Sequence, residues 1–312
     1  MNFTNEGIEK ILKDKFHTNI KIKSIGNHDL NRHMVYKIDG AYDFPIVFKI
    51  FYKKNRRNRE LASLKLLSNE NIKAPNLIDY GELSNGTEWM ITNYIEGTNL
   101  CNVINDMNDY QRSNILKEMG IELGKLHTIK EFDFFGNWDE DGNSTEENND
   151  FKSVFIKRTE ITISNLLKQS LPEEDIFKEA IRILRDNYYI LDDVKKSRLC
   201  HNDFDGRNIL VVKDNNNWTI KGIIDFEQAL PWDIDNEIAY LYHKYFLKNS
   251  SYTEYFLEGY KKYVNYNLKI TNKIKFYLIY KGIEICSWSN IKAPDYYEEG
   301  LNLVKKFYKD YR

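Results

Sequence analysis

The chain has 312 residues, of which 42% are apolar and 14% aromatic, and its formal net charge is −2. This length is enough for two domains with substantial cores, and the apolar content excludes an intrinsically disordered chain. The balanced charge gives no global attraction to nucleic acid or to an anionic membrane. We therefore expect a globular protein without a nucleic-acid partner, in which any attraction for a cationic ligand is local.

Three widely spaced cysteines, Cys101, Cys200 and Cys286, have no metal-ligand spacing and predict no disulfide framework, as is usual in a reducing compartment. Of these, Cys200 is expected to be a small, buried strand residue. Residues 1–6 lack a basic segment followed by an apolar core, and no apolar run approaches the length of a membrane span. We expect a cytoplasmic protein with no membrane partner.

The beginning of the chain changes from helical to strand-like spacing of its apolar residues. Residues 6–16 carry isoleucine and leucine at helical spacing, whereas residues 20–23 alternate isoleucine and lysine as a strand does. Residues 35–38 predict a second strand. Between these two strands, Gly26 opens a turn-like segment that reaches Asn31. Taken alone, such a strand–turn–strand unit fits an ordinary surface hairpin equally well.

Lys49 lies inside an apolar strand predicted over residues 45–51. An ammonium group there needs a partner or a solvent-exposed face. Glu60 begins an amphipathic helix predicted over residues 60–67, after the basic segment 53–59, which predicts a solvated loop and helix start. We favour an ion pair between this strand and this helix over a lysine that points outward.

The middle and end of the chain predict two more strands and then mainly helices. The strands are expected over residues 74–81 and 89–97, and a helix over residues 116–127 ends at His127, a hydrogen-bonding residue rather than a catalyst. The acid-rich stretch that ends at Asp150 lacks EF-hand spacing and predicts a solvated loop. Further helical segments are expected over residues 152–168, 174–194, 236–247, 252–266, 273–289 and 295–310.

The pattern His201-x-Asp203-x4-Asn208 lies between two apolar segments. A further apolar run at residues 220–224 is followed directly by Asp225. Two strands that end in carboxylates, with an asparagine between them, suit phosphoryl transfer. One carboxylate orients the attacking hydroxyl and accepts its proton, while the asparagine and the other carboxylate hold Mg²⁺. Single Asp and Asn residues at strand ends are usually turn formers. Two such motifs in this order favour the chemical interpretation.

This spacing resembles the catalytic loop of protein kinases, His-Arg-Asp-x4-Asn, and its later Asp-Phe-Gly. Asn202 replaces the arginine and Glu227 replaces the glycine. Both departures resemble the aminoglycoside phosphotransferase family of small-molecule kinases. The resemblance implies an α+β, bilobal protein-kinase-like fold. A β-rich, nucleotide-binding N-lobe with one main helix would span residues 1–95, and a larger, mostly helical catalytic and substrate-binding C-lobe would span residues 96–312.

The second half of the resemblance lies just after Asp225. The segment 224–233 is similar to the family's second motif, although Trp232 stands where glycine is usual and Ile234 where proline is usual. The run that starts at Glu237 is similar to the family's Asp-Leu-Ala, with Glu for Asp. In motif order, the resemblance covers roughly residues 20–300, with its strongest matches over residues 199–239.

The resemblance implies transfer of the γ-phosphoryl group of ATP or GTP to a substrate hydroxyl. Asp203 would orient and deprotonate that hydroxyl, and Asn208 and Asp225 would bind Mg²⁺. Lys49, held by Glu60, would position the phosphates.

The nucleotide would also meet two backbone segments. The turn that begins at Gly26 would cover the phosphates, and the backbone of Asn93, Tyr94 and Ile95 would face the purine edge. These assignments depend on position in the fold, because backbone contacts leave little trace in a sequence.

The resemblance suggests an aminoglycoside acceptor and hence antibiotic resistance. A polycationic sugar needs carboxylates and a surface for its ring. Candidate residues are Asp203, Asp233, Glu237, Glu284 and Trp288. Choline, sugar, homoserine and macrolide kinases share the scaffold, and an aromatic cage for choline could form from Trp288, Tyr277, Tyr280 and Tyr296.

A kinase-like binding module that has lost catalysis is the non-enzymatic alternative. Such a module is expected to lack at least one of Lys49, Asp203, Asn208 and Asp225, and all four are present. The acceptor, its phosphorylated position, the choice between ATP and GTP, the oligomeric state and the biological role, resistance or metabolism, remain open at this point.

Overall fold

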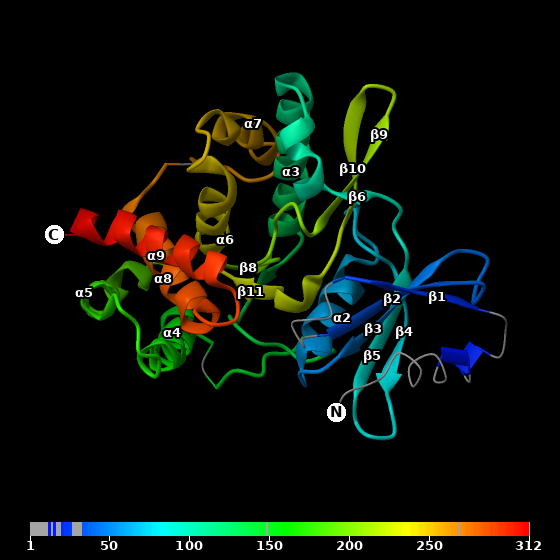
Figure 1. The fold of residues 1–312 in the computed structure, drawn as a ribbon, viewed down its shortest axis with the longest axis horizontal. Helices are drawn as coiled ribbons and strands as arrows, with labels where there is room; N and C mark the ends of the chain where they lie inside the picture. The colour runs from blue at the N-terminus through cyan, green and yellow to red at the C-terminus, as the bar shows by residue number, and fades with distance from the viewer. Residues whose placement is uncertain are drawn as a thin grey trace. The chain divides into compact units, whose positions relative to one another are not determined.

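A computed structural model describes residues 12–13, 15–16, 20–26, 33–147, 149–267 and 269–311 (Figure 1). Its contacts define two compact units, whose segments alternate along the chain. Unit 1 comprises Met1–Val103, Asp139–Gly142 and Gly206–Gln228, and unit 2 comprises Ile104–Trp138, Asn143–Asp205 and Ala229–Arg312. The functional boundary predicted after residue 95 stays a prediction.

Unit 1 contains an antiparallel sheet of five described strands in the order β1-β2-β3-β5-β4. In β2, buried and half-buried side chains alternate, and Met34, Tyr36 and Ile38 face the core. This alternation of burial is typical of a strand with one face on the core, and it confirms the strand predicted over residues 35–38. The strands are β1 (Lys21–Ile25), β2 (His33–Asp39), β3 (Ile46–Phe51), β4 (Leu77–Glu82) and β5 (Glu88–Asn93).

The main helix of unit 1, α2 (Arg56–Leu67), begins four residues before the predicted start at Glu60. Asn55 precedes it with a left-handed backbone (φ 68°), which asparagine tolerates better than most residues. The basic segment 53–59 therefore contains both a loop and the start of the helix, as predicted, and the helix begins within it. Similarly, β5 ends at Asn93, before the Gly97 at which the strand was predicted to break.

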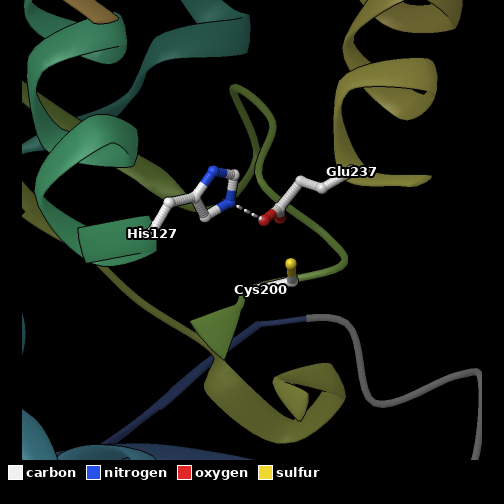
Figure 2. Close-up of side chains that lie close together, drawn as sticks. All are labelled: His127, Cys200 and Glu237. Atoms are coloured by element: carbon white, nitrogen blue, oxygen red, sulfur yellow. Dashed lines mark hydrogen bonds and ion pairs between the residues drawn. The ribbon is translucent and has the colours of Figure 1, made fainter. Parts of the chain in front are cut away.

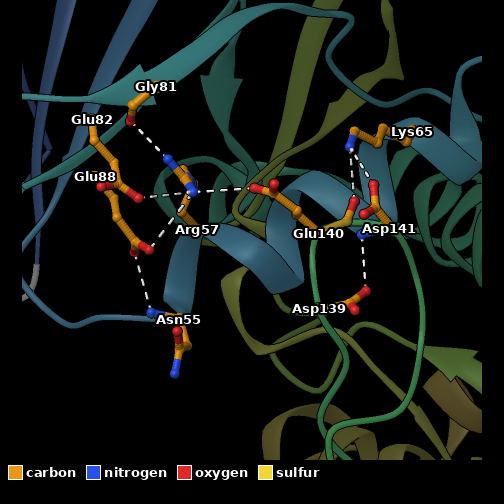
Figure 3. Close-up of polar contacts among 9 residues, drawn as sticks. All are labelled: Asn55, Arg57, Lys65, Gly81, Glu82, Glu88, Asp139, Glu140 and Asp141. Carbon is orange, nitrogen blue, oxygen red and sulfur yellow. Dashed lines mark hydrogen bonds and ion pairs between the residues drawn. The ribbon is translucent and has the colours of Figure 1, made fainter. Parts of the chain in front are cut away.

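Buried Arg57 explains why a distant segment, Asp139–Gly142, belongs to unit 1 (Figure 3). Its guanidinium donates hydrogen bonds to the carbonyl of Gly81 (2.7 Å) and to Oε2 of Glu140 (3.2 Å). Lys65, also on α2, donates from Nζ to the carbonyl of Glu140 (2.9 Å). Charge-assisted hydrogen bonds of this kind tie the segment to the helix that carries Glu60.

A second, three-stranded sheet of unit 1 has the order β10-β9-β6. Its hairpin joins β9 (Ile209–Asp214) to β10 (Asn217–Ile223), and β6 (Thr98–Asn99) pairs with β9. Gly222 in β10 lies so close to Ile95 that a Cβ atom there would be 2.6 Å from its Cδ1. The glycine therefore permits this close approach.

Unit 2 is mostly helical. A Cβ atom on Gly120 would lie 2.0 Å from the carbonyl oxygen of Phe256, and one on Gly259 would lie 1.9 Å from that of Lys117. These two glycines let α3 and α7 cross in close contact. The described helices are α3 (Asp109–Thr128), α4 (Phe151–Leu167), α5 (Glu174–Asp186), α6 (Ile234–Leu241), α7 (Ser251–Tyr260), α8 (Asn272–Ser289) and α9 (Pro294–Phe307).

Unit 2 also holds a small antiparallel sheet of β11 (Leu230–Trp232), β8 (Ser197–Cys200) and β7 (Glu131–Phe132), in that order. Within the described ranges, no helix has the length and apolar content needed to cross a membrane. A unit rich in β-strands and a mostly helical unit confirm the α+β, kinase-like fold class predicted from the sequence.

Four of the described helices, α5, α6, α7 and α9, end at least three residues before their predicted ends. Helix α5 stops at Asp186 because Asn187 follows it and donates from Nδ2 to the carbonyl of Ile183 (2.8 Å), which satisfies a helix-end acceptor. A single π turn follows α6 and a 3-10 turn follows α9.

Parts of two predictions lie outside the described residues. They are residues 6–11 and 14 of the first predicted helix, and residues 27–31 of the predicted phosphate-covering turn. Gly26 itself is described, with φ +91°, a conformation that favours glycine.

Candidate active site

In unit 1, Lys49 extends from β3 into a cluster of three carboxylates. Its ammonium Nζ lies 2.8 Å from Oε2 of Glu60, 2.7 Å from Oδ1 of Asp225 and 3.7 Å from Oε2 of Glu227. The lysine side chain is only 7% exposed. The ion pair predicted between Lys49 and Glu60 is therefore confirmed.

Burial by itself lowers the pKa of Lys49, but the charges of Asp225, Glu60 and Glu227 outweigh it and hold this pKa well above its ordinary value. Burial raises the pKa of Glu60, and its carboxylate neighbours add to that effect while Lys49 opposes it. One ammonium thus lies among three carboxylates, which leaves an excess of negative charge in the cluster. Such a cluster is prepared to accept additional positive charge.

The hairpin of β9 and β10 brings together Asn208 and Asp225, the two predicted metal ligands. Asn208 directly precedes β9, and its carbonyl accepts a hydrogen bond from the N–H of Ile224, the residue before Asp225 (2.9 Å). Asp225 has a left-handed backbone (φ 67°), which costs an L-residue about 1 kcal/mol or more and is common at functional sites. Its carboxylate is 26% exposed.

The amide and carboxylate oxygens of Asn208 and Asp225 are the hard donors that Mg²⁺ prefers. The left-handed turn at Asp225 also leaves part of its carboxylate accessible. The residues present therefore fit a Mg²⁺ ion bound together with phosphate oxygens.

Glu227 is a functional candidate that the sequence analysis treated only as a departure from Asp-Phe-Gly. Its Oε2 lies 3.1 Å from Nδ1 of His33 on β2, and suitable ligand atoms of His33, Asp225 and Glu227 lie within 4.8 Å of one another. Burial raises the pKa of Glu227, but His33 and Lys49 outweigh it and lower the pKa overall. In the sequence, the only indication of this role was an Asp-x-Glu pattern, Asp225 and Glu227, directly after an apolar strand.

The segment predicted to face a purine begins at Asn93, the last residue of β5. The N–H of Asn93 donates to the carbonyl of Asn76 (3.2 Å), and the N–H of Tyr94 donates to the carbonyl of Pro45 (2.9 Å). Both amides are therefore used inside unit 1. Ile95 is the next residue, and its side chain packs over the glycine of β10.

In unit 2, Glu237 supports the backbone of the segment that carries Asp203. Its two carboxylate oxygens accept hydrogen bonds from the N–H groups of His201 (3.0 Å) and Asn202 (2.7 Å). Asn202 has a left-handed backbone (φ 60°), so these bonds stabilise a strained turn. Glu237 is fully buried, and it has no exposed oxygen for the acceptor contact predicted from the sequence.

His127, Cys200 and Glu237 form a buried group whose residue types could suit a metal (Figure 2). However, Nε2 of His127 lies 2.8 Å from Oε2 of Glu237, and its Nδ1 lies 2.6 Å from the hydroxyl of Tyr260. Burial raises the pKa of the Cys200 thiol well above its ordinary value, which favours the neutral form. The group is therefore a hydrogen-bonded network. It confirms His127 as a hydrogen-bonding residue at a helix end and Cys200 as a buried strand residue.

Asp203 follows this supported turn, and its Oδ1 lies 2.8 Å from the hydroxyl of Tyr240 on α6. Asp233, another candidate for acceptor binding, is the N-cap of α6. Its Oδ2 lies 2.6 Å both from the hydroxyl of Tyr277 and from Nζ of Lys273, and its side chain is 6% exposed. The carboxylate of Asp233 is thus already paired with Lys273 inside unit 2.

Glu284 and Trp288 share α8, as predicted. Glu284 is paired with Nζ of Lys281 (2.7 Å) and is 38% exposed. The Trp288 ring lies 5.8 Å from that of Tyr296, whereas buried Tyr277 packs against core aromatic residues. The four-residue aromatic cage considered for choline is therefore incorrect in its use of Tyr277.

Comparisons with known proteins identify a family for the chain and solved structures with a similar fold. The family model described as "Phosphotransferase enzyme family" (APH) matches residues 27–267. No curated protein matches the sequence. Among solved structures, aminoglycoside phosphotransferase APH(4)-Ia is similar with a TM-score of 0.75, 15% identity and coverage of 98% of this chain and 99% of that one. Aminoglycoside 2'-phosphotransferase-IIIa, solved with GDP, has a TM-score of 0.70, 14% identity and coverage of 99% and 100%.

Proposed function

Because this chain belongs to the phosphotransferase enzyme family, we propose that it is a Mg²⁺-dependent small-molecule kinase that transfers the γ-phosphoryl group of ATP or GTP to a hydroxyl group. The observation that carries the proposal is the buried Lys49, bound by both Glu60 and Asp225. A strand lysine paired with a helix glutamate is the arrangement with which kinases position nucleotide phosphates.

On the donor side, Lys49 has three N–H donors, and two of them meet Glu60 and Asp225. Oε2 of Glu227 lies beyond hydrogen-bond distance at 3.7 Å, so the third N–H would contact a phosphate oxygen. The N–H groups of Asn93 and Tyr94 have partners within unit 1, so the backbone of Ile95 is the best candidate for the purine edge. The turn that begins at Gly26 would cover the phosphates.

Asn208 and Asp225 would hold Mg²⁺, which neutralises charge on the phosphates when it is bound. Asp203 would accept a hydrogen bond from the acceptor hydroxyl, orient it and take its proton. Glu237 maintains the backbone turn before Asp203, so that the base keeps one orientation. Positioning and charge neutralisation would supply most of the rate acceleration.

An aminoglycoside is the first acceptor class to test, with antibiotic resistance as the corresponding role in the cytoplasm. Structures with this fold include APH(4)-Ia with AMP-PNP and hygromycin B, and APH(2")-IIIa with GDP and kanamycin. In this chain, Glu284 and Trp288 lie four residues apart on α8 and would offer a carboxylate and a ring to an aminosugar.

A neutral or singly charged hydroxyl compound is the second candidate. Glu284 is paired with Lys281, and Asp233 is paired with Lys273. A polycationic acceptor would have to displace these lysines or find other carboxylates. A sugar, choline, homoserine or a macrolide carries less positive charge and needs fewer carboxylates.

The test is a panel of acceptors incubated with Mg²⁺ and either ATP or GTP, with phosphorylated product measured directly. The panel contains kanamycin, hygromycin B, a macrolide, choline, homoserine and neutral sugars. Transfer to kanamycin or hygromycin B supports the first class, and transfer only to another compound replaces that class while retaining the kinase. Absence of transfer to every acceptor, together with no binding of Mg²⁺-nucleotide, contradicts the proposed function.

A further inference from the structure

Tyr240, a buried residue on α6, lies against two carboxylates of the catalytic segment. Its hydroxyl oxygen is 2.8 Å from Oδ1 of Asp203 and 2.6 Å from Oδ2 of Asp205. We propose that Tyr240 is a positioning residue for the catalytic base, because its hydroxyl fixes the carboxylate of Asp203 in the orientation that receives the acceptor's proton. This inference rests on the proposed function, in which Asp203 is that base.

The two carboxylates have different positions in unit 2. Asp205 is buried, and its N–H donates to the backbone carbonyl of Asp203 (3.0 Å), so the two residues form a tight turn. A phenol has a single hydrogen and donates it to one carboxylate at a time. In the proposed role this hydrogen is donated to Asp203, and Asp205 is the competing acceptor.

The ring of Tyr240 lies close to two lysines, Lys281 on α8 and Lys244 in the π turn that follows α6. Nζ of Lys281 lies 4.9 Å from the ring centroid, and Nζ of Lys244 lies 5.8 Å from it. Each lysine is itself fixed by a carboxylate, Glu284 for Lys281 and Glu299 for Lys244. An ammonium close to an aromatic ring attracts it, so these pairs restrict how the ring can move.

Tyr240 and Glu237 support different parts of the segment that carries the base. They are three residues apart on α6 and therefore share one helix face. Glu237 binds the backbone N–H groups of His201 and Asn202, whereas Tyr240 binds the side chain of Asp203. One helix thus fixes both the turn and the reactive carboxylate, which is the kind of outer support that a precise site requires.

The first test is Tyr240→Phe, which removes the hydroxyl and keeps the ring. We expect kcat for transfer to fall on the order of tenfold to a hundredfold, part of what a positioned base contributes. KM for the nucleotide should stay within about twofold, because Tyr240 acts on the acceptor side. Tyr242→Phe is the matched control, since Tyr242 is also buried and its ring packs against Phe246. This control should keep kcat.

The second test uses Asp205. An alanine at this position removes the competing acceptor and leaves the hydrogen of Tyr240 to Asp203. We therefore expect Tyr240→Phe to lower kcat in the Asp205→Ala background by at least the factor seen in wild type. If Tyr240→Phe has no effect on kcat in that background, the hydroxyl acts through Asp205 and the proposal is overturned.

A crystal structure of the Tyr240→Phe variant tests the geometry independently of any acceptor. Displacement or loss of order of the Asp203 carboxylate supports the proposal, even if wild type phosphorylates nothing in the acceptor panel and the proposed function fails. An unchanged Asp203 rotamer overturns the proposal. A kcat within about threefold of that of an active wild type also overturns it and leaves the kinase function intact.

Discussion

Replacement of Lys49 by methionine is expected to destabilise unit 1 strongly and in a pH-dependent way. At 2.8 Å, the attraction between Lys49 and Glu60 is about 6 kcal/mol for an effective dielectric constant of about 20. Methionine also avoids the cost of burying an ammonium, so the net loss should be about 3–5 kcal/mol, the usual effect of breaking a buried ion pair. For a unit of this size, that loss lowers the melting temperature by about 10 °C.

The pH dependence follows from Glu60, which remains buried in the variant. Burial raises its pKa from the ordinary value of 4.5, and Lys49 is a group that opposes this rise. Without Lys49 the pKa rises further. A group with a raised pKa in the folded state favours folding below its unfolded pKa, and that contribution is lost as the pH rises through the folded pKa. The Lys49→Met variant should therefore be least affected near about pH 5 and most affected near about pH 8.

Differential scanning calorimetry at about pH 5 and about pH 8 measures both effects. Lys221→Met is the control, because Lys221 is an exposed lysine on β10 in the same unit. Adding Glu60→Gln to the Lys49→Met variant should recover stability at the higher pH, since it removes the unpaired charge. A melting temperature within about 2 °C of wild type at about pH 8, or an equal loss at both pH values, would refute this reasoning.

Three further predictions concern the proposed reaction. Asp203→Asn should lower transfer by a factor on the order of 10²–10⁴ while nucleotide binding is kept, and turnover within about threefold of wild type would contradict its role as base. Asp225→Ala should weaken Mg²⁺-dependent nucleotide binding in titration calorimetry, and unchanged binding would identify Asp225 as structural. With an aminoglycoside acceptor, Glu284→Gln should raise KM and reduce its dependence on salt, with little change in kcat; unchanged kinetics would remove Glu284 from the acceptor site.

The features that could be predicted from the sequence are those with a local pattern. The largely apolar runs at residues 35–38 and 45–51 predicted β2 and β3 of the main sheet, and a strand lysine followed by Glu60 at a helix start predicted the strand–helix ion pair that the structure contains. The β9–β10 hairpin likewise brings Asn208 beside the residue before Asp225. In each case the partners are close in sequence or belong to one supersecondary unit.

The features that were missed depend on residues far apart in the sequence. Tyr240 contacts Asp203 across 37 positions, and Asp225 reaches Lys49 across 176. A tyrosine in an apolar helix predicts core packing as readily as a hydrogen bond to a base. Glu237 resembled an accessible carboxylate until its burial and its two backbone donors were seen. Tertiary contacts of this kind have no periodic signal.

The alternation of the two units along the chain has a consequence for synthesis on the ribosome. Unit 1 starts at the N-terminus, yet it requires Gly206–Gln228, which supplies β9, β10 and Asp225. Translation from Glu60 to Asp225 takes on the order of ten seconds or more at common elongation rates. During that interval Lys49 lacks two of its carboxylate neighbours, Asp225 and Glu227. The unit that emerges first is therefore completed only after much of unit 2 has been translated, and an N-terminal fragment such as Met1–Val103 should not fold as an independent nucleotide-binding domain.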